Sequence, residues 1–392
     1  MLHTRAAATL GSQERGLSSF ADLPPGTGTG LAAAVGISGG EALMVDLVHD
    51  GPHAVVVGMT GSGKSELLTT WVATLCRDRS PREVTFLLVD FKGGRTFDAL
   101  TRLPHVTGVL TDLDEAKAVR AVESLRAEIT HRERMLAELA ARDVSEAAGT
   151  LPRLVIVVDE YAALVATHPG LHEVFGDHAA RGRALGMHLI LASQRVAGSF
   201  RDAVLANAPL RVALRVTDAG ESRAVLGTPA AAALSGAADA RGLALVRRAS
   251  DDAPVLVRVI PCPREALVTI AARAEAQAAG VVVRAPWLPA LPASIRLESV
   301  RRAGEIVLGV MDEPAAQRQP VLTLEAGVAG FVVVGGSGSG KTEVLRSVAA
   351  QAARCAWLPA DAEAAWDFGV ALESQPPGTV ICLDDVDAVL AR

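Results

Sequence analysis

The chain has 392 residues, half of them hydrophobic, which predicts a globular protein of two or three domains that each bury a core. Its formal net charge of −6 does not favour a general nucleic-acid or anionic-membrane surface, although a local basic loop would not show in the total. Its four cysteines are far apart, with no zinc spacing and no disulfide framework, so a reducing cytosol fits best. The chain has no apolar run long enough to span a bilayer and no signal-peptide pattern.

The first domain is expected at residues 31–283, after a lead-in of residues 1–30 that is rich in Ala, Gly and Ser. Two short strands are predicted at residues 32–37 and 42–47, and a third, buried strand at residues 54–57. This third strand leads directly into the motif around which the domain is organised.

Residues 58–65 read Gly-Met-Thr-Gly-Ser-Gly-Lys-Ser and precede a predicted helix at residues 66–75. Between a strand and a helix this spacing indicates a phosphate-binding loop, because its glycines let backbone N–H groups surround phosphate oxygens and the helix N-terminus favours an anion. Lys64 is expected to reach the β- and γ-phosphates of ATP, and Ser65 to hold Mg²⁺. The alternative is a glycine-rich strand–helix turn. The predicted nucleotide-binding residues of this loop are Gly58, Met59, Thr60, Gly61, Ser62, Gly63, Lys64 and Ser65.

The apolar run at residues 84–89 ends in Asp90, which is followed by Phe-Lys-Gly-Gly. This pattern is typical of a buried parallel strand with polar groups at its carboxyl end, the edge where α/β proteins bind ligands. The alternative is a turn with an exposed lysine. A long helix is expected at residues 112–142, where apolar residues recur at helical spacing.

The apolar run at residues 154–158 ends in Asp159 and Glu160, which is typical of the second half of a nucleoside-triphosphatase site. Asp159 is expected to hold the Mg²⁺ shell through water, and Glu160 to polarise the attacking water. Catalysis at such a site is mainly positioning and charge stabilisation.

After a helix at residues 171–185, a strand at residues 188–193 ends in Gln194. In the P-loop class that carries a catalytic Glu, this strand lies between the loop strand and the Asp-Glu strand, so Gln194 would face the γ-phosphate. The alternative role of Gln194 is a strand-end hydrogen bond. Further strands are predicted at residues 210–216, 242–246 and 255–260. Together these elements predict an α/β fold of the RecA-like P-loop class, a mainly parallel sheet with helices on both faces.

A proline-rich linker at residues 284–293 is expected to separate this domain from a second P-loop unit at residues 294–392. A loop strand is predicted at residues 331–334 and an acidic strand at residues 379–385. Two of the chain's four lysines thus occupy two phosphate loops. The predicted nucleotide-binding residues of the second unit are Gly335, Gly336, Ser337, Gly338, Ser339, Gly340, Lys341, Thr342, Asp384 and Asp385.

The second unit departs from the first. Its interval from lysine to acid is 43 residues, against 95 in the first unit, and an Asp, Asp385, stands where the first unit has Glu160. It has no second Asp-x-Lys-Gly-Gly pattern, and the chain stops soon after the acidic strand. We therefore expect a shortened or incomplete unit that binds nucleotide weakly or is catalytically silent.

Five stretches resemble the FtsK/SpoIIIE family of motor ATPases: residues 58–68, 88–94, 157–160, 182–195 and 221–227. Within that family the chain looks most like the EccC/EssC type, the multi-ATPase engine of type VII secretion. The tandem P-loop units, the Trp-Leu-Pro-Ala-Leu-Pro connector and the segment from residue 308 to 319 carry this closer resemblance. It covers the chain from about residue 20 to its end.

The resemblance implies hexameric rings in which an Arg of one subunit enters the neighbour's site and accelerates hydrolysis. Arg120 and Arg183 match positions where the family carries basic residues, and the alternative for each is a surface Arg. The family's membrane segments are missing from this chain. It is therefore expected in the cytoplasm, at the inner face of the membrane through absent segments or a membrane partner.

Three functions remain open from the sequence. The first is an ATP-driven motor that exports a protein recognised through an export signal. The second is a DNA translocase with the same chemistry. The negative net charge of the chain and its low content of aromatic residues, 3%, argue mildly against it. The third is a nucleotide-regulated scaffold without turnover, because the resemblance implies that the linker between units can hold the first ATPase inactive.

Overall fold

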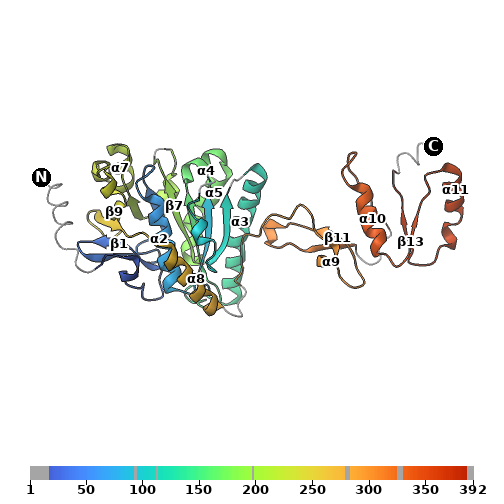
Figure 1. Ribbon diagram of the computed structural model, residues 1–392, viewed down its shortest axis with the longest axis horizontal. Coiled ribbons are helices and arrows are strands. Elements are labelled where there is room, and N and C mark those ends of the chain that lie inside the picture. Colours follow the sequence, from blue (N-terminus) through green and yellow to red (C-terminus); the bar gives the residue numbers. More distant parts are fainter. Residues whose placement is uncertain are drawn as a thin grey trace. The chain divides into compact units, whose positions relative to one another are not determined.

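The structure is a computed structural model that describes residues 17–91, 95–111, 114–196, 198–278, 283–324 and 330–385 (Figure 1). The chain divides into two compact units. Unit 1 comprises Met1–Leu288 and Pro314–Gln317, and unit 2 comprises Pro289–Glu313 and Arg318–Arg392. The domain boundaries expected from the sequence remain predictions.

Unit 1 is built on one large sheet. Its strands are β1 (Ala32–Ser38), β2 (Glu41–Asp46), β3 (His53–Val57), β4 (Val84–Asp90), β5 (Val106–Thr111), β6 (Arg153–Asp159), β7 (Met187–Ser193), β8 (Leu210–Ala213), β9 (Leu243–Arg247) and β10 (Val255–Val259). Among the described residues they form ten strands in the order β2-β1-β10-β9-β8-β3-β7-β6-β4-β5. From β8 to β5 every pairing is parallel, and the remaining pairings are antiparallel. The predicted mostly parallel sheet is confirmed, and so is the position of β7 between β3 and β6.

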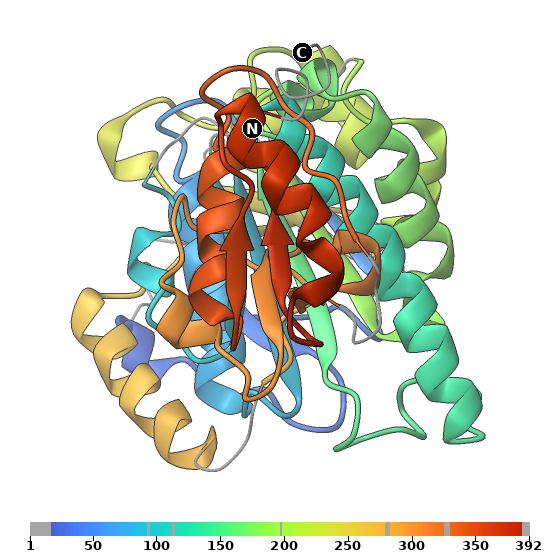
Figure 2. The ribbon, with the colours of Figure 1, turned by 90° about the vertical axis from the view of Figure 1, so that its right-hand side faces the viewer.

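Helices cover both faces of this sheet. They are α2 (Lys64–Asp78), α3 (Glu115–Glu138), α4 (Tyr161–Thr167), α5 (Gly170–Leu185), α6 (Asp202–Asn207), α7 (Ala219–Leu226) and α8 (Arg264–Ala278), with short 3-10 helices η1 (Phe20–Asp22), η2 (Asp98–Leu100), η3 (Ala230–Ala233) and η4 (Ala238–Ala240). Figure 2 shows α8 and α3 on opposite sides of the sheet. In β3, Ala54 and Val56 belong to the core shared with α2 and α8, whereas Val55 and Val57 belong to the core shared with α3 and α5. The alternation follows from the two-residue period of a strand.

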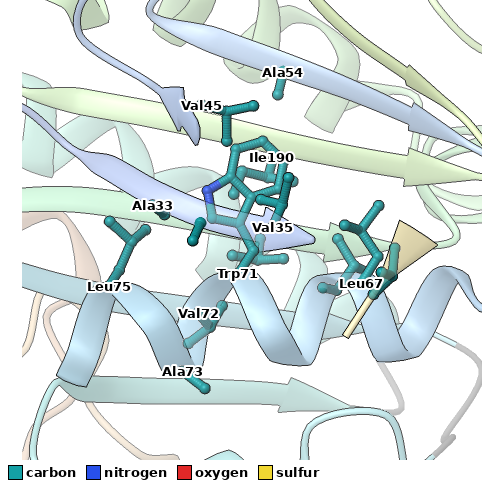
Figure 3. Packing of buried hydrophobic residues seen from close by; sticks show 14 of the residues in the cluster. Ala33, Val35, Val45, Ala54, Leu67, Trp71, Val72, Ala73, Leu75 and Ile190 are labelled. Atoms are coloured by element: carbon teal, nitrogen blue, oxygen red, sulfur yellow. The ribbon is translucent and has the colours of Figure 1, made fainter. Parts of the chain in front are cut away.

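Trp71 is the largest fully buried side chain of α2. Figure 3 shows its indole pointing from the helix toward Val35, Val45 and Ile190 of the sheet, with Leu67 and Leu75 on the same helix. Burial of a side chain of this size contributes several kcal/mol to the packing of α2 on the sheet. Because α2 starts at the predicted phosphate loop, this packing also fixes where that loop lies.

The predicted helix at residues 112–142 is shorter in the structure. Residues 112 and 113 lie outside the described residues, and α3 starts after Asp114, whose carboxylate accepts a hydrogen bond from the N–H of Lys117. The helix ends at Glu138, because Ala140 adopts a left-handed backbone with φ of 51°. The apolar pattern predicted a helix up to residue 142, but the left-handed backbone at Ala140 ends it earlier.

In its described residues, unit 2 contains two small sheets. Its elements are α9 (Leu297–Val300), β11 (Ile306–Val310), β12 (Val321–Leu324), α10 (Lys341–Gln351), β13 (Cys355–Trp357), α11 (Ala362–Val370), η6 (Leu372–Ser374) and β14 (Val380–Cys382). The remaining 3-10 helix, η5 (Pro314–Ala316), belongs to unit 1. Strands β11 and β12 pair antiparallel, and β13 and β14 pair parallel.

The predicted loop strand at residues 331–334 is wrong. These described residues are not in a strand, and Val332 and Val334 are 86% and 89% exposed. Their β-forming side chains stabilise a strand only when neighbouring strands pair and pack with it. Within the described ranges, no helix of the chain is both long enough and apolar enough to cross a membrane.

Candidate nucleotide site

The loop at residues 58–65 joins the end of β3 to the start of α2, as the sequence predicts. The N–H of Gly58 donates to the carbonyl of Ser193 at the end of β7 (3.2 Å), and the N–H of Met59 donates to the carbonyl of Arg215 beyond β8 (2.9 Å). The loop is therefore held by both strands that flank β3. It ends at the N-terminus of α2, where free N–H groups and the helix dipole favour an anion.

Two glycines are required by close approach. A Cβ on Gly58 would lie 2.7 Å from Oγ of Ser62, and a Cβ on Gly63, which has φ of 101°, would lie 2.9 Å from Cα of Gly242. The loop can pass this close to the chain at Gly242 because Gly63 carries no side chain. The N–H of Gly242 also donates to the carbonyl of Ser62 (2.9 Å).

Lys64 lies at the centre of the site. Its side chain is 7% exposed, and its Nζ lies 2.5 Å from Oδ1 of Asp159 and 2.9 Å from Oε1 of Glu160. Asp159 is the last residue of β6, and Glu160 precedes α4 with a left-handed φ of 60°. A non-glycine residue in this conformation stores strain, which is common where side chains are aimed at a ligand.

Gln194 connects the loop to Glu160. Its Nε2 donates to Oε1 of Glu160 (2.6 Å), and its Oε1 accepts from the hydroxyl of Thr60 (3.1 Å). Residues from the loop, β6 and the end of β7 thus form one hydrogen-bonded group. Strand order explains this, because β7 lies between β3 and β6.

The sequence did not identify Thr96 as part of this site. The hydroxyl of Thr96 donates to Oδ2 of Asp159 (2.9 Å), and its N–H donates to Oδ2 of Asp90 (3.2 Å). Asp90 ends β4 and pairs in register with Asp159. The Lys-Gly-Gly that completes the predicted motif, residues 92–94, lies outside the described residues. No local signal marks Thr96, because its contact with Asp159 joins residues that are 63 positions apart in the sequence.

The residues present fit a magnesium–nucleotide complex. Oγ of Ser62 is buried and has no hydrogen-bond partner in the described part of the chain, so a polar atom already lies inside the loop. Ser65 stands in the first turn of α2 and is only partly buried. The hydroxyl of Ser65 and the carboxylate of Asp159 are the hard oxygen donors that Mg²⁺ prefers.

The two predicted trans arginines lie elsewhere. The guanidinium of Arg120, in the second turn of α3, stacks on the ring of Trp287 at 5.2 Å. Arg183, in the last turn of α5, is exposed and lines a cavity of about 670 Å³ with Arg153 and Arg181. Since Arg153 begins β6 and Asp159 ends it, this cavity lies at the opposite end of that strand from the nucleotide site.

The second loop keeps the backbone but not the surroundings. Its lysine, Lys341, donates from Nζ to the carbonyls of Gly335 (3.0 Å) and Gly336 (2.9 Å) in its own loop. The hydroxyl of Thr342 donates to Oδ2 of Asp384 (2.8 Å). Of the predicted loop residues Gly335, Gly336, Ser337, Gly338, Ser339, Gly340, Lys341 and Thr342, it is Thr342 that bonds Asp384, and the adjacent Asp385 has a left-handed φ of 49°.

Fold and site together define a P-loop ATPase, since the phosphate loop, the acidic strand and the polar strand end occupy the positions of that class. Residues 29–151 match the model of the FtsK/SpoIIIE family. Part of unit 1 thus matches the FtsK/SpoIIIE family model, and the relatives to which the chain is similar include proteins of type VII secretion.

One such relative is the type VII secretion system protein EssC of Staphylococcus aureus strain NCTC 8325 / PS 47. It is 29% identical over 396 residues, which cover 83% of this chain and 26% of EssC, so the chain spans about a quarter of that relative. The solved cytoplasmic domain of the type VII secretion ATPase EccC of Thermomonospora curvata matches with a TM-score of 0.75 and 27% identity, over 98% of this chain and 50% of that one. ATPases 2 and 3 of the same EccC, solved in complex with a signal sequence peptide, share the fold with a TM-score of 0.62 and 23% identity, over 91% of this chain and 67% of that one.

Proposed function

We propose that this chain is a magnesium-dependent ATPase that forms part of a protein-export motor of the type VII secretion kind. The observation that carries the proposal is the contact of Lys64 with Asp159 and Glu160 at the carboxyl end of the sheet. Phosphoryl transfer to water needs a phosphate-binding cation, a carboxylate for the magnesium shell and a carboxylate beside the attacking water. These three residues supply that set.

Lys64 has to change partners during the reaction. Phosphate oxygens in the loop would take its ammonium group from the two carboxylates, which frees Glu160 to polarise a water. That water attacks the γ-phosphorus, the bond from phosphorus to the bridging oxygen breaks, and ADP and phosphate result. Gln194 would hold Glu160 through the 2.6 Å hydrogen bond and face the γ-phosphate. Bound Mg²⁺, held by Ser65 and Asp159, would neutralise phosphate charge.

The cargo is proposed to be a protein recognised through an export signal. Homology to EssC and the signal peptide bound by the related EccC ATPases support this choice over DNA. The resemblance further suggests a hexameric ring at the inner face of the membrane, joined there by a membrane partner or by segments not in this sequence. Arg120 or Arg183 would then act in a neighbouring subunit.

Restraint of the first ATPase is part of the proposal, and one group of contacts within unit 1 supports it. Nε2 of Gln317 donates to Oε2 of Glu128 (3.1 Å), a fully buried carboxylate that also binds Arg132 and Arg284. The segment Pro314–Gln317 is thereby attached to α3. A segment bound in this way could hold α3 still and slow turnover.

The test is steady-state ATP hydrolysis with and without Mg²⁺, and with added double-stranded DNA. Wild-type chain is compared with Glu160→Gln and with Glu173→Gln, an exposed glutamate of α5 that serves as matched control. We expect magnesium-dependent turnover that is indifferent to DNA and falls about 10²–10⁴-fold in Glu160→Gln alone.

Other outcomes decide between the functions. Strong stimulation by DNA, lost in Glu160→Gln, would establish a DNA motor and overturn the export proposal. Turnover that rises when residues 284–392 are removed would support a brake in that region. The same absence of turnover in joined and separated units would favour a nucleotide-regulated scaffold.

A further inference from the structure

Thr96 contacts the two carboxylates that end neighbouring strands. Asp90 of β4 and Asp159 of β6 are register partners in a parallel pair and are 2% and 5% exposed. The hydroxyl of Thr96 donates to Asp159 and its N–H donates to Asp90. One residue thus gives a hydrogen bond to each of two buried acids.

Two such acids at one sheet edge repel each other unless donors or cations satisfy them. In the structure Lys64 occupies Oδ1 of Asp159 and Thr96 occupies Oδ2. A phosphate in the loop would draw Lys64 away from Oδ1. Of the two hydrogen bonds that the described residues make to this carboxylate, the one from Thr96 would then remain.

We propose that Thr96 is a positioning residue for the magnesium site: it holds Oδ2 of Asp159 so that Oδ1 stays directed at the metal shell after Lys64 has moved to phosphate. This inference rests on the proposed function. Partners that orient a ligating carboxylate matter because their loss typically weakens metal affinity or activity 10–100-fold. The bond to Asp90 through the backbone keeps the hydroxyl of Thr96 in place.

The experiment measures binding of a fluorescent, non-hydrolysable ATP analogue at increasing Mg²⁺ and, separately, in EDTA. Thr96→Val removes the hydroxyl and keeps the shape, and Thr96→Ser restores the hydroxyl. Thr101→Val is the matched control, because the hydroxyl of this exposed threonine binds only the carbonyl of Asp98 among the described residues. Thermal melting of each variant reports on folding.

We expect Thr96→Val to raise the Mg²⁺ concentration for half-maximal binding about tenfold or more. Binding in EDTA should not change, and Thr96→Ser and Thr101→Val should match wild type. An unchanged Mg²⁺ requirement in Thr96→Val would overturn the inference, and so would equal weakening with and without Mg²⁺ or a rescue that fails. Wild-type binding that is indifferent to Mg²⁺ would instead overturn the magnesium part of the proposed function.

Discussion

The two phosphate loops have nearly the same backbone in very different surroundings. The glycine before each helix is left-handed, with φ of 101° at Gly63 and 91° at Gly340. The second acid of each acidic pair is left-handed too, with φ of 60° at Glu160 and 49° at Asp385. The local motif therefore sets the loop and the turn in both units.

The surroundings come from the sheet. Helix α2 buries ten of its residues, whereas α10 buries Val348 alone among its own. Lys64 is held by the carboxylates of Asp159 and Glu160 at the end of β6, and Lys341 binds carbonyls of its own loop. The local motif therefore determines the loop conformation, whereas the polar groups around the lysine come from the ends of other strands and require a sheet of several strands.

The largest expected effect tests this packing. Trp71→Ala in α2 should destabilise unit 1 by about 3–5 kcal/mol, because it leaves a cavity in a closed core. Trp366→Ala in α11 should change the stability of unit 2 by less than about 0.5 kcal/mol, since that side chain is 75% exposed. Denaturant unfolding followed by circular dichroism gives both values. Equal losses would mean that α11 packs in solution as tightly as α2.

The loops themselves can be compared through their lysines. Lys64→Ala should lower ATP turnover at least about a hundredfold, because a donor to the transferring phosphate is lost. Lys341→Ala should leave turnover within about twofold, since its amine faces its own loop. Hydrolysis rates at saturating ATP check both variants. A large loss in Lys341→Ala would show that the second loop contributes to catalysis.

The sequence predicted the parts of the site that are local in the chain. The loop, the acid pair and Gln194 could be found because each follows a strand whose apolar run is plain. The strand order around β7 could also be inferred, since it follows from the class. Thr96 could not, because it lies 63 residues before Asp159 in the sequence and only the fold brings the two together. The strand predicted at residues 331–334 was wrong because a run of β-forming residues forms a strand only when a neighbouring strand pairs with it.

Lowering the pH should destabilise unit 1 more than unit 2. Burial lowers the pKa of His53 and His178 to about 4 and that of His188 to about 3, all in unit 1, and residues 289–392 contain no histidine. Unfolded histidines bind protons below pH 6.5 and the folded ones do not, so unit 1 loses stability as pH falls from about 6.5 toward 4. The loss is at most about 1.4 kcal/mol per pH unit for each histidine.

Denaturant melts of the chain at pH 7, 6 and 5 measure this loss. His188→Asn should keep a donor to the carbonyl of Pro52, which Nδ1 of His188 contacts at 2.9 Å, while removing one titrating group. Its unit 1 transition should therefore fall less steeply between pH 6.5 and 5 than that of wild type. The unit 2 transition should be the same in both. An equal slope for the two chains would mean that His188 is already protonated, or already exposed, in the native state.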